Sequence, residues 1–278
     1  MEKGKKGGKG TVYVSRFEGD WKESVNVLLG GAGLGNALKG LERVIIKPNL
    51  VEAIKPPVTT PVGLTAAIVD YIKDAAPHVE PVVAEGTGAA DYETPHTFRE
   101  LGYETLAREK GLRLVDLNVE PLVELSNPAL TRWPVIYLPK IVMESFVISV
   151  PVLKAHSLSV VTLSMKNMMG AAPPAHYQQG GHWKKSAFHT QMHESVLDLN
   201  RYCLPDFSII DATVGLRDYH LGGAECDPHP GLLVAGSDPV AVDAYGAGLL
   251  KKDWREIGHI REAHNELGSA GPLKVVPC

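Results

Sequence analysis

The chain has 278 residues and a formal net charge of −4 at pH 7, with 44% hydrophobic and 22% charged residues. These values are typical of a globular protein, and the length suits one large α/β domain or two small ones. The negative charge excludes a global basic field for nucleic acid, and no apolar run reaches the length of a membrane span.

The N-terminal segment and the cysteines narrow the class of protein further. Residues 1–10, MEKGKKGGKG, are rich in lysine and glycine and cannot bury a core, so we expect a disordered basic tail. Cys203, Cys226 and Cys278 are scattered, and none lies in a CxxC or a ferredoxin-like run. Since no signal peptide is visible, we expect a cytoplasmic protein without an iron–sulfur cluster in this chain.

Apolar, β-branched segments alternate with helical patterns along the chain. In chain order the first half predicts a strand at 11–17, a helix weakened by glycines at 21–38, a strand at 43–49, a helix at 60–76, a strand at 79–88, a helix at 96–111 and a strand at 112–118. The second half predicts two or three strands within 133–153, a short helix within 159–170, a helix at 186–203, strands at 207–213 and 231–237, and a helix at 238–250. This alternation predicts a single α/β domain over 11–278, with a largely parallel or mixed sheet and helices on both faces.

Local signals support several of these boundaries. Thr60 and Asp238 each precede a proline at a predicted helix start and are predicted N-caps, and Gly111 is the predicted stop of its helix. The glycines within 30–36 follow helical rather than strand sequence, which favours a glycine-broken helix over a dinucleotide site.

Polar or ionisable side chains follow the apolar runs of five predicted strands. They are Lys47 and Asn49, Glu85, Lys154 and His156, Asp211, and Asp238. Parallel sheets bind ligands beyond the carboxyl ends of their strands. Side chains that converge there predict a functional site at this edge of the sheet.

The charges at this edge suit an anion. Lys47, Lys154 and Lys166 lie near predicted helix starts, where cations and backbone N–H groups together favour a carboxylate or phosphate. The alternative for each lysine is that it simply reaches solvent. Asp238 is better interpreted as an N-cap, whereas Asp243, one turn later, either reaches the pocket or complements the helix dipole.

Histidines are concentrated between residues 176 and 193. His189 and His193 are four residues apart in a predicted helix, so they share one face and form half of a site for a divalent transition metal. The third ligand would be His156, His182 or Asp211. No HExxH arrangement is present, which excludes that class of metalloprotease.

The same segment has a second interpretation. Residues 170–188 have the glycine, proline and glutamine content of a lid or a surface loop, and Tyr177 and Trp183 are candidates to close over a ligand. A lid would bring one histidine to the pocket as an acid, a base or a ligand anchor.

Several motifs occur together in a familiar order: VIIKPNLV, VVAEGTG, VISVPVLKAHSLSVVTLSMKNMMG, DFSIIDAT and LLVAGSDPVAVDA. Over about residues 40–250 they resemble the prokaryotic family called domain of unknown function 362. Many of its members carry a Cys-rich ferredoxin-like segment and are labelled iron–sulfur proteins, whereas this chain lacks the Cys runs. The family motif residues that the resemblance carries over are Lys47, Asn49, Glu85, Lys154, His156, Lys166, Asn167, Asp211, Asp238 and Asp243.

The sequence therefore predicts an enzyme that acts on a small anionic molecule, and the histidine pair suggests a divalent transition metal as its cofactor. The predicted catalytic residues are His156, Lys154 and Glu85, the predicted substrate-binding residues are Lys47, Asn49, Lys166, Asn167 and Asp243, and the predicted metal ligands are His156, His189, His193 and Asp211. One alternative is a non-catalytic redox partner that docks onto a separate ferredoxin. Another is a module that binds a metabolite without turnover, and a homo-oligomer is compatible with each.

Overall fold

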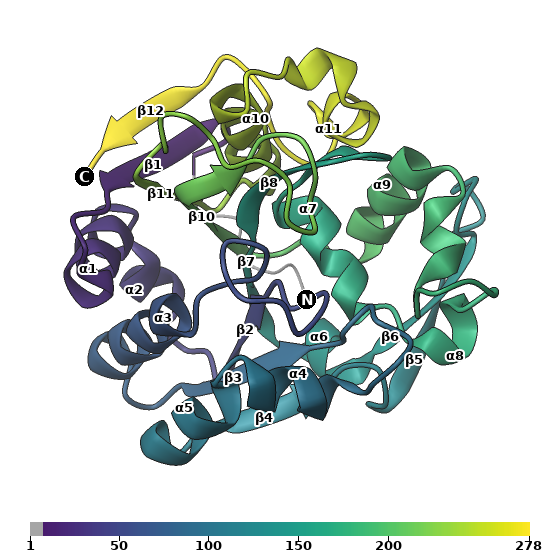
Figure 1. Ribbon diagram of the computed structural model, residues 1–278, viewed down its shortest axis with the longest axis horizontal. Helices are drawn as coiled ribbons and strands as arrows, with labels where there is room; N and C mark the ends of the chain where they lie inside the picture. The colour runs from purple at the N-terminus through teal and green to yellow at the C-terminus, as the bar shows by residue number, and fades with distance from the viewer. Residues whose placement is uncertain (1–7) are drawn as a thin grey trace.

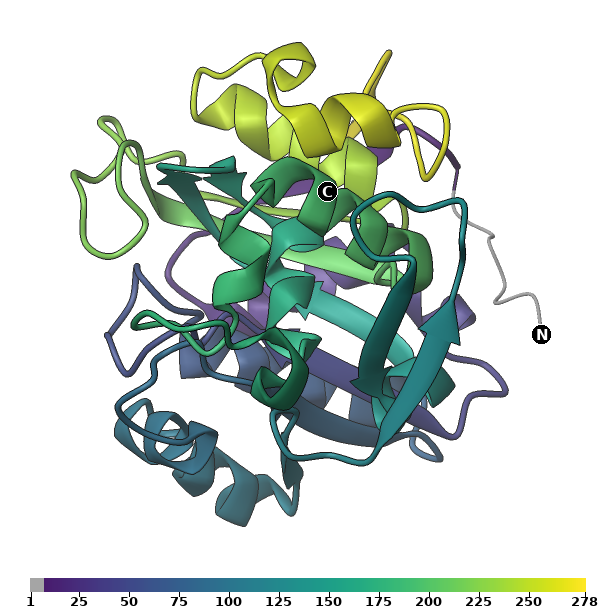
Figure 2. The same cartoon turned by 90° about the vertical axis from the view of Figure 1, so that its right-hand side faces the viewer.

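Most strands of the computed structural model, which describes residues 8–278, belong to one twisted sheet (Figure 1). Its strands are β1 (Thr11–Arg16), β2 (Arg43–Pro48), β3 (Glu80–Glu85), β4 (Arg113–Asp116), β7 (Phe146–Val150), β8 (Val152–His156), β9 (Val160–Thr162), β10 (Phe207–Leu216), β11 (Leu232–Gly236) and β12 (Lys274–Pro277). A separate antiparallel pair, β5 (Leu122–Ser126) and β6 (Val135–Pro139), lies in front of this sheet in Figure 2.

The order across the sheet is β12–β1–β11–β10–β7–β2–β3–β4. Strands β10, β7, β2, β3 and β4 are parallel to one another, whereas β11 is antiparallel to both of its neighbours. Strand β8 pairs in parallel with β10 and antiparallel with β9. The predicted class, a largely parallel or mixed α/β sheet, is confirmed. Because β11 runs the other way, its carboxyl end lies at the opposite edge from those of β2, β3 and β7.

Both faces of the sheet are buried, as its apolar strands predict. Val44 and Ile46 of β2 pack into one hydrophobic cluster and Ile45 into the other, because successive side chains point to opposite faces. One face is covered by α1 (Trp21–Gly31), α2 (Leu34–Ala37) and α3 (Val62–Ala75). The other is covered by α7 (Ser164–Asn167), the 3-10 helix η1 (Met168–Ala171), α9 (Met192–Tyr202), α10 (Pro239–Leu249) and α11 (Gly258–Ala263).

The remaining helices are short or peripheral. Helices α4 (Thr94–Glu100) and α5 (Tyr103–Lys110) contribute to a third cluster with Leu50 and Val83. The connecting helices are α6 (Lys140–Glu144), α8 (Pro174–Tyr177), η2 (Ser186–His189) and η3 (Trp254–Glu256). No helix within residues 8–278 has both the length and the apolar character needed to cross a bilayer.

Glycines divide two of the predicted helices. The predicted helix at 21–38 breaks at Gly33, whose φ of 69° places it in the left-handed region. The predicted helix at 96–111 becomes α4 and α5, separated by Gly102 with a φ of 82°. Glycine adopts these angles at little steric cost, so each break is local. Gly111 ends α5, as predicted.

The two predicted N-caps have different outcomes. Asp238 caps α10 by accepting the backbone N–H groups of Val240 and Ala241, so this prediction is confirmed. The Thr60 prediction is wrong, because α3 begins one residue later, with Pro61 at its cap. The Thr60 hydroxyl instead donates to the Val150 carbonyl at 2.6 Å and joins the start of α3 to β7.

The end of the predicted basic tail is ordered. Residues 1–7 of that tail lie outside the described residues. Gly10 is buried, and its N–H donates to Asp238 Oδ2 at 2.9 Å, so the tail prediction is wrong at this residue. The Asp238 carboxylate thus joins the beginning of the chain to the helix that it caps.

Candidate functional site

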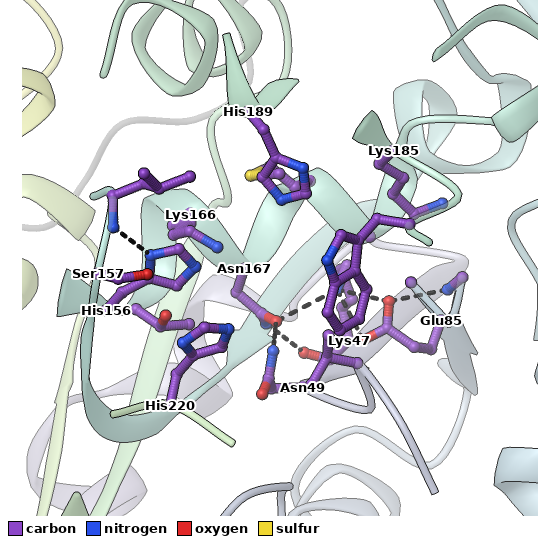
Figure 3. Close-up of a pocket in the computed structure, with 18 of the residues that line it drawn as sticks. Lys47, Asn49, Glu85, His156, Ser157, Lys166, Asn167, Lys185, His189 and His220 are labelled. Carbon is purple, nitrogen blue, oxygen red and sulfur yellow. Dashed lines mark hydrogen bonds and ion pairs between the residues drawn. The ribbon is translucent and has the colours of Figure 1, made fainter. Parts of the chain in front are cut away.

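A pocket of about 410 Å³ opens at the carboxyl ends of β2 and β3. Its other walls come from β8, from α7 with η1, from the segment 183–189 and from residues 219–220. Lys166, His156, His189 and His220 point into the same space (Figure 3). A pocket of this size suits a small molecule.

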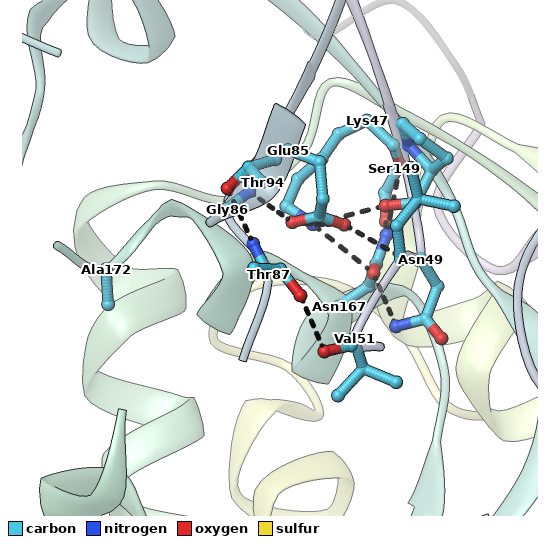
Figure 4. Close-up of polar contacts among 12 residues, drawn as sticks. Lys47, Asn49, Val51, Glu85, Gly86, Thr87, Thr94, Ser149, Asn167 and Ala172 are labelled. Atoms are coloured by element: carbon cyan, nitrogen blue, oxygen red, sulfur yellow. Dashed lines mark hydrogen bonds and ion pairs between the residues drawn. The ribbon is translucent and has the colours of Figure 1, made fainter. Parts of the chain in front are cut away.

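A buried ion pair between Lys47 and Glu85 forms the floor of the pocket (Figure 4). Lys47 Nζ lies 2.9 Å from each carboxylate oxygen, and these oxygens also accept the N–H groups of Gly86 and Leu50 at 2.8 and 3.1 Å. Burial lowers the pKa of Lys47, and the Glu85 charge opposes that shift. Because four donor contacts occupy the two oxygens, this geometry suits Glu85 to hold Lys47 rather than to accept a proton.

Asn167 links this ion pair to Asn49 and to Ser149 of β7. Its Oδ1 accepts from Lys47 Nζ at 3.3 Å and from Asn49 Nδ2 at 3.1 Å. Its Nδ2 donates to the Lys47 carbonyl at 3.1 Å and to Ser149 Oγ at 3.0 Å. Both lone pairs and both N–H groups of the Asn167 amide are therefore used within the protein, although the residue lines the pocket.

Lys154 lies beneath the pocket. Its ammonium donates to Asn49 Oδ1 at 2.7 Å and to the Val58 carbonyl at 2.7 Å, and the residue is not part of the pocket lining. Burial, followed by the charge of Lys166, lowers the pKa of Lys154 to about 7. The predicted strand end at Leu153 is wrong. Strand β7 ends at Val150, and after Pro151 a new strand, β8, begins at Val152. Lys154 and His156 consequently lie within β8 rather than beyond a strand end.

Lys166 is the lining lysine that the protein leaves free. Within the described part of the chain its ammonium makes no hydrogen bond or ion pair. Burial lowers its pKa to about 8. By contrast, the Lys185 ammonium donates to Asn118 Oδ1 and to the Ala172 carbonyl, and burial lowers its pKa to about 7.

Backbone contacts fix the orientation of His156. Its Nδ1 accepts the N–H groups of Leu158 and Ser159 at 3.0 and 3.3 Å. Burial and then the Lys166 charge lower its pKa, so the ring is neutral and its proton is on Nε2. A histidine that binds a metal through Nε2 normally donates from Nδ1, so this hydrogen bonding does not fit the predicted metal role of His156.

Two further imidazoles complete this side of the pocket. The His220 ring stacks on that of His156 with centroids 4.0 Å apart, and burial followed by the Lys166 charge lowers its pKa to about 3. Burial and the Lys166 charge also lower the pKa of His189. Three neutral imidazoles therefore lie around the Lys166 ammonium, which has no partner among the described residues.

His220 and Lys185 are pocket residues that the sequence analysis missed. His220 was missed because β10 continues to Leu216, three residues beyond the predicted end at 213, so the true end of the strand lies closer to His220. Lys185 follows Lys184 in a polar segment, and nothing in that pattern distinguishes a buried lysine from a solvated one. Lys184 is in fact paired with Glu93 at 2.7 Å.

The predicted lid segment is partly packed. Trp183 lines the pocket, as expected of a residue that covers a ligand. Tyr177 does not line it, because it is buried in the main core and its hydroxyl accepts the Tyr137 N–H at 2.8 Å. Motion of residues 170–188 as a lid stays a prediction.

The predicted aspartates lie outside the pocket lining. Asp211 is in the middle of β10 and accepts the backbone N–H and the hydroxyl of Thr213 at 3.0 and 2.7 Å. Asp243 accepts the N–H groups of Ser164 and Met165 at 2.7 and 2.9 Å. Asp243 thus holds the first turn of α7, the helix that carries Lys166 and Asn167, instead of facing a ligand.

The structure does not assemble the predicted metal ligands. The predicted helix at 186–203 is confirmed from Met192 to Tyr202 as α9. Its beginning is wrong, because His189 ends η2 and Gln191, with a φ of 51°, separates it from α9. His193 instead places its Nδ1 3.0 Å from Nδ1 of His259. Among residues 8–278, no group of three or more histidine, cysteine, aspartate or glutamate side chains has a geometry that would hold a metal ion.

The fold and the site together define an α/β protein with a lysine- and histidine-lined pocket at the carboxyl edge of its sheet. Residues 44–248 match the family model described as Domain of unknown function (DUF362), so the chain belongs to that family. A similar protein is the thylakoid-associated protein sll1697 of Synechocystis sp., which is 25% identical over 232 residues, covering 80% of this chain and 67% of its own length.

Proposed function

We propose that this protein is an enzyme that binds a small molecule bearing a carboxylate or phosphate group in the pocket above the Lys47–Glu85 pair. The observation that carries the proposal is the ammonium of Lys166, which faces the pocket without a partner in the described part of the chain. Holding a half-buried cation without a counter-ion costs free energy, and an anionic ligand would supply that counter-ion.

The imidazoles give the pocket a means of moving protons. His156 presents Nε2–H as a hydrogen-bond donor to a ligand oxygen, since its Nδ1 is occupied by the backbone. His189 is neutral and is able to take a proton from a bound molecule, whereas a pKa of about 3 suits His220 to hydrogen bonding rather than to base catalysis. The residues that contact ligand in this proposal are therefore Lys166 and the three histidines, with Lys47, Asn167 and Lys154 supporting them from below.

Thermal unfolding in the presence of anions tests the binding step. Phosphate and oxalate should raise the melting temperature, because a ligand at a hundred times its Kd stabilises the folded state by about 2.7 kcal/mol. Acetamide, a small neutral amide, should not. Lys166→Met should remove the effect, and Lys22→Met, a change of an exposed lysine on α1, should leave it intact. Equal stabilisation of wild type and Lys166→Met would overturn the proposal.

Turnover separates an enzyme from a binding module. The protein is incubated with a panel of small carboxylates and phosphates, and product formation is followed by mass spectrometry. Consumption that is lost in His189→Gln supports an enzyme. Ligands that stabilise the fold without any consumption would make the protein a module that binds a metabolite. This proposal includes no transition metal. Elemental analysis of the purified protein tests the metal predicted from the sequence separately.

The redox-partner alternative and the location have their own tests. Retention of a separate ferredoxin on the immobilised protein, abolished by none of the pocket substitutions, would favour docking over small-molecule chemistry.

We propose a cytoplasmic location. The Synechocystis relative is described as thylakoid-associated, and recovery of this chain with membranes after cell fractionation would contradict the cytoplasmic proposal.

A further inference from the structure

Lys166 differs from the neighbouring lysines because its ammonium has no hydrogen-bond or ion-pair partner among residues 8–278. Lys47 is paired with Glu85, and Lys185 donates to two oxygens of the surrounding chain. Glu85, the carboxylate of the described pocket lining, is already occupied by four donor contacts. The free ammonium is thus held in a site that favours loss of its proton.

Three imidazoles and a second lysine lie around Lys166, and burial lowers the Lys166 pKa. His156 faces it from β8, His189 from the end of η2 and His220 from the loop after β10, while Lys154 lies below. With a pKa of about 8, roughly a tenth of the Lys166 side chains are neutral amines at pH 7, against fewer than about one in a thousand for an exposed lysine. Desolvated lysines near other cationic groups are those that proteins use as amine nucleophiles.

We infer that Lys166 is a nucleophile that forms an imine with a 2-oxo acid. The inference rests on the proposed function and deepens it, since it names the anion as a carboxylate that carries a neighbouring carbonyl group. The Nε2–H of His156 is a donor to the carboxylate or to the carbonyl oxygen, because the backbone occupies Nδ1 of this ring.

The atoms of this reaction balance within the pocket. The imidazole of His189 takes one proton from the Lys166 ammonium, and the amine then attacks the carbonyl carbon. The N–C bond forms as the C=O π bond breaks, and a proton moves from nitrogen to oxygen to give a carbinolamine. The imidazolium returns its proton to the hydroxyl, which leaves as water as the C=N bond forms. One ammonium and one carbonyl thus give one protonated imine and one water.

Reductive trapping tests the inference directly. The full chain is incubated with pyruvate and sodium cyanoborohydride, whose hydride adds to the iminium carbon and leaves a stable secondary amine. Peptide mapping by mass spectrometry should place the adduct on Lys166, at a rate on the order of tenfold or more above exposed lysines such as Lys22. Oxalate, which has no ketone, should compete and slow the labelling.

Lys166→Arg is the decisive variant, because it keeps the positive charge but cannot form an imine. We expect it to retain stabilisation by oxalate and to lose the adduct, whereas Lys22→Arg should behave like wild type. Labelling that spreads evenly over exposed lysines, or that persists unchanged in Lys166→Arg, would overturn the inference. If oxalate stabilises wild type while no adduct forms on Lys166, the imine fails and anion binding stands. If neither is observed, both proposals fail.

Discussion

Lys47 and Glu85 form an ion pair of 2.9 Å in the protein interior, where the two side chains are only 1% and 3% exposed. They stand at the ends of β2 and β3, neighbouring parallel strands, so the pair closes the sheet edge beneath the pocket. A buried pair of this kind is costly to break from one side, because the remaining charge has no partner.

Glu85→Gln should therefore destabilise the protein severely. It leaves the Lys47 ammonium buried without its counter-ion, and we expect the free energy of unfolding to fall by about 3–5 kcal/mol. Urea denaturation measures the change. Glu80→Gln at the exposed start of the same strand is the matched control, because its pair with Arg43 is solvated and should contribute less than about 1 kcal/mol. Equal losses for the two variants would contradict the role of the buried pair.

Gly170→Ala tests how closely the chain packs over that pair. A Cβ atom at Gly170 would overlap Glu85 Oε1 and Lys47 Nζ, and neither has room to withdraw. We expect a loss of about 1–3 kcal/mol in the free energy of unfolding, measured by urea denaturation. Gly30→Ala on α1 meets no atom within 4 Å and should be neutral or stabilising. A stable Gly170→Ala protein would show that the floor can shift.

Stability should rise with pH between 7 and 9. Lys154 has a pKa of about 7 in the folded chain against an ordinary value of 10.5, so in this range the unfolded chain binds a proton that the folded chain does not. Unfolding then takes up a proton, and the free energy of unfolding increases by up to about 1.4 kcal/mol per pH unit for this group. Lys154→Met should make the dependence shallower, whereas Lys22→Met should not alter it. An unchanged slope in Lys154→Met would exclude Lys154 as the source.

Anion affinity should fall as pH rises through about 8. The ammonium of Lys166 is the proposed anchor, and above its pKa of about 8 the anchor loses its charge. Oxalate keeps a constant charge over this range. Isothermal titration calorimetry with oxalate at pH 7 and pH 9 therefore reports how titration of protein groups changes the affinity. Lys166→Arg should bind oxalate with little pH dependence, because arginine remains charged. An equal pH dependence in that variant would place the titrating group elsewhere.

The sheet and most of its helices could be predicted because each apolar strand carries its own signal. The runs around Ile45 and Ile148 are buried on both faces, which a continuous apolar pattern indicates. The direction of β11 carries no such signal, since the residues that fill a strand are the same whichever way it runs. That is why Asp238, which follows β11, is named among the polar strand ends although it lies at the opposite edge, where it caps α10 as predicted.

Site residues could be predicted where they lie at a strand end that borders the pocket. They were missed where packing between residues far apart in the chain determines their position. Lys47 lies at the end of β2 and Asn49 follows that strand directly, so their position could be inferred from the strand alone. His220 reaches the pocket only because β10 is longer than its apolar core, and His193 is turned toward His259 by a break at Gln191. Those outcomes depend on residues far apart in the chain, which a local pattern does not contain.

Through the contact between Asp243 and the first turn of α7, helix α10 holds the helix that carries Lys166. Two backbone N–H groups, from Ser164 and Met165, rest on one carboxylate, and Lys166 is the next residue. A side chain that never meets the ligand thereby sets where the amine points. A selection for altered ligand preference would consequently recover changes behind the pocket as well as within it, and the two classes would be told apart only by structure.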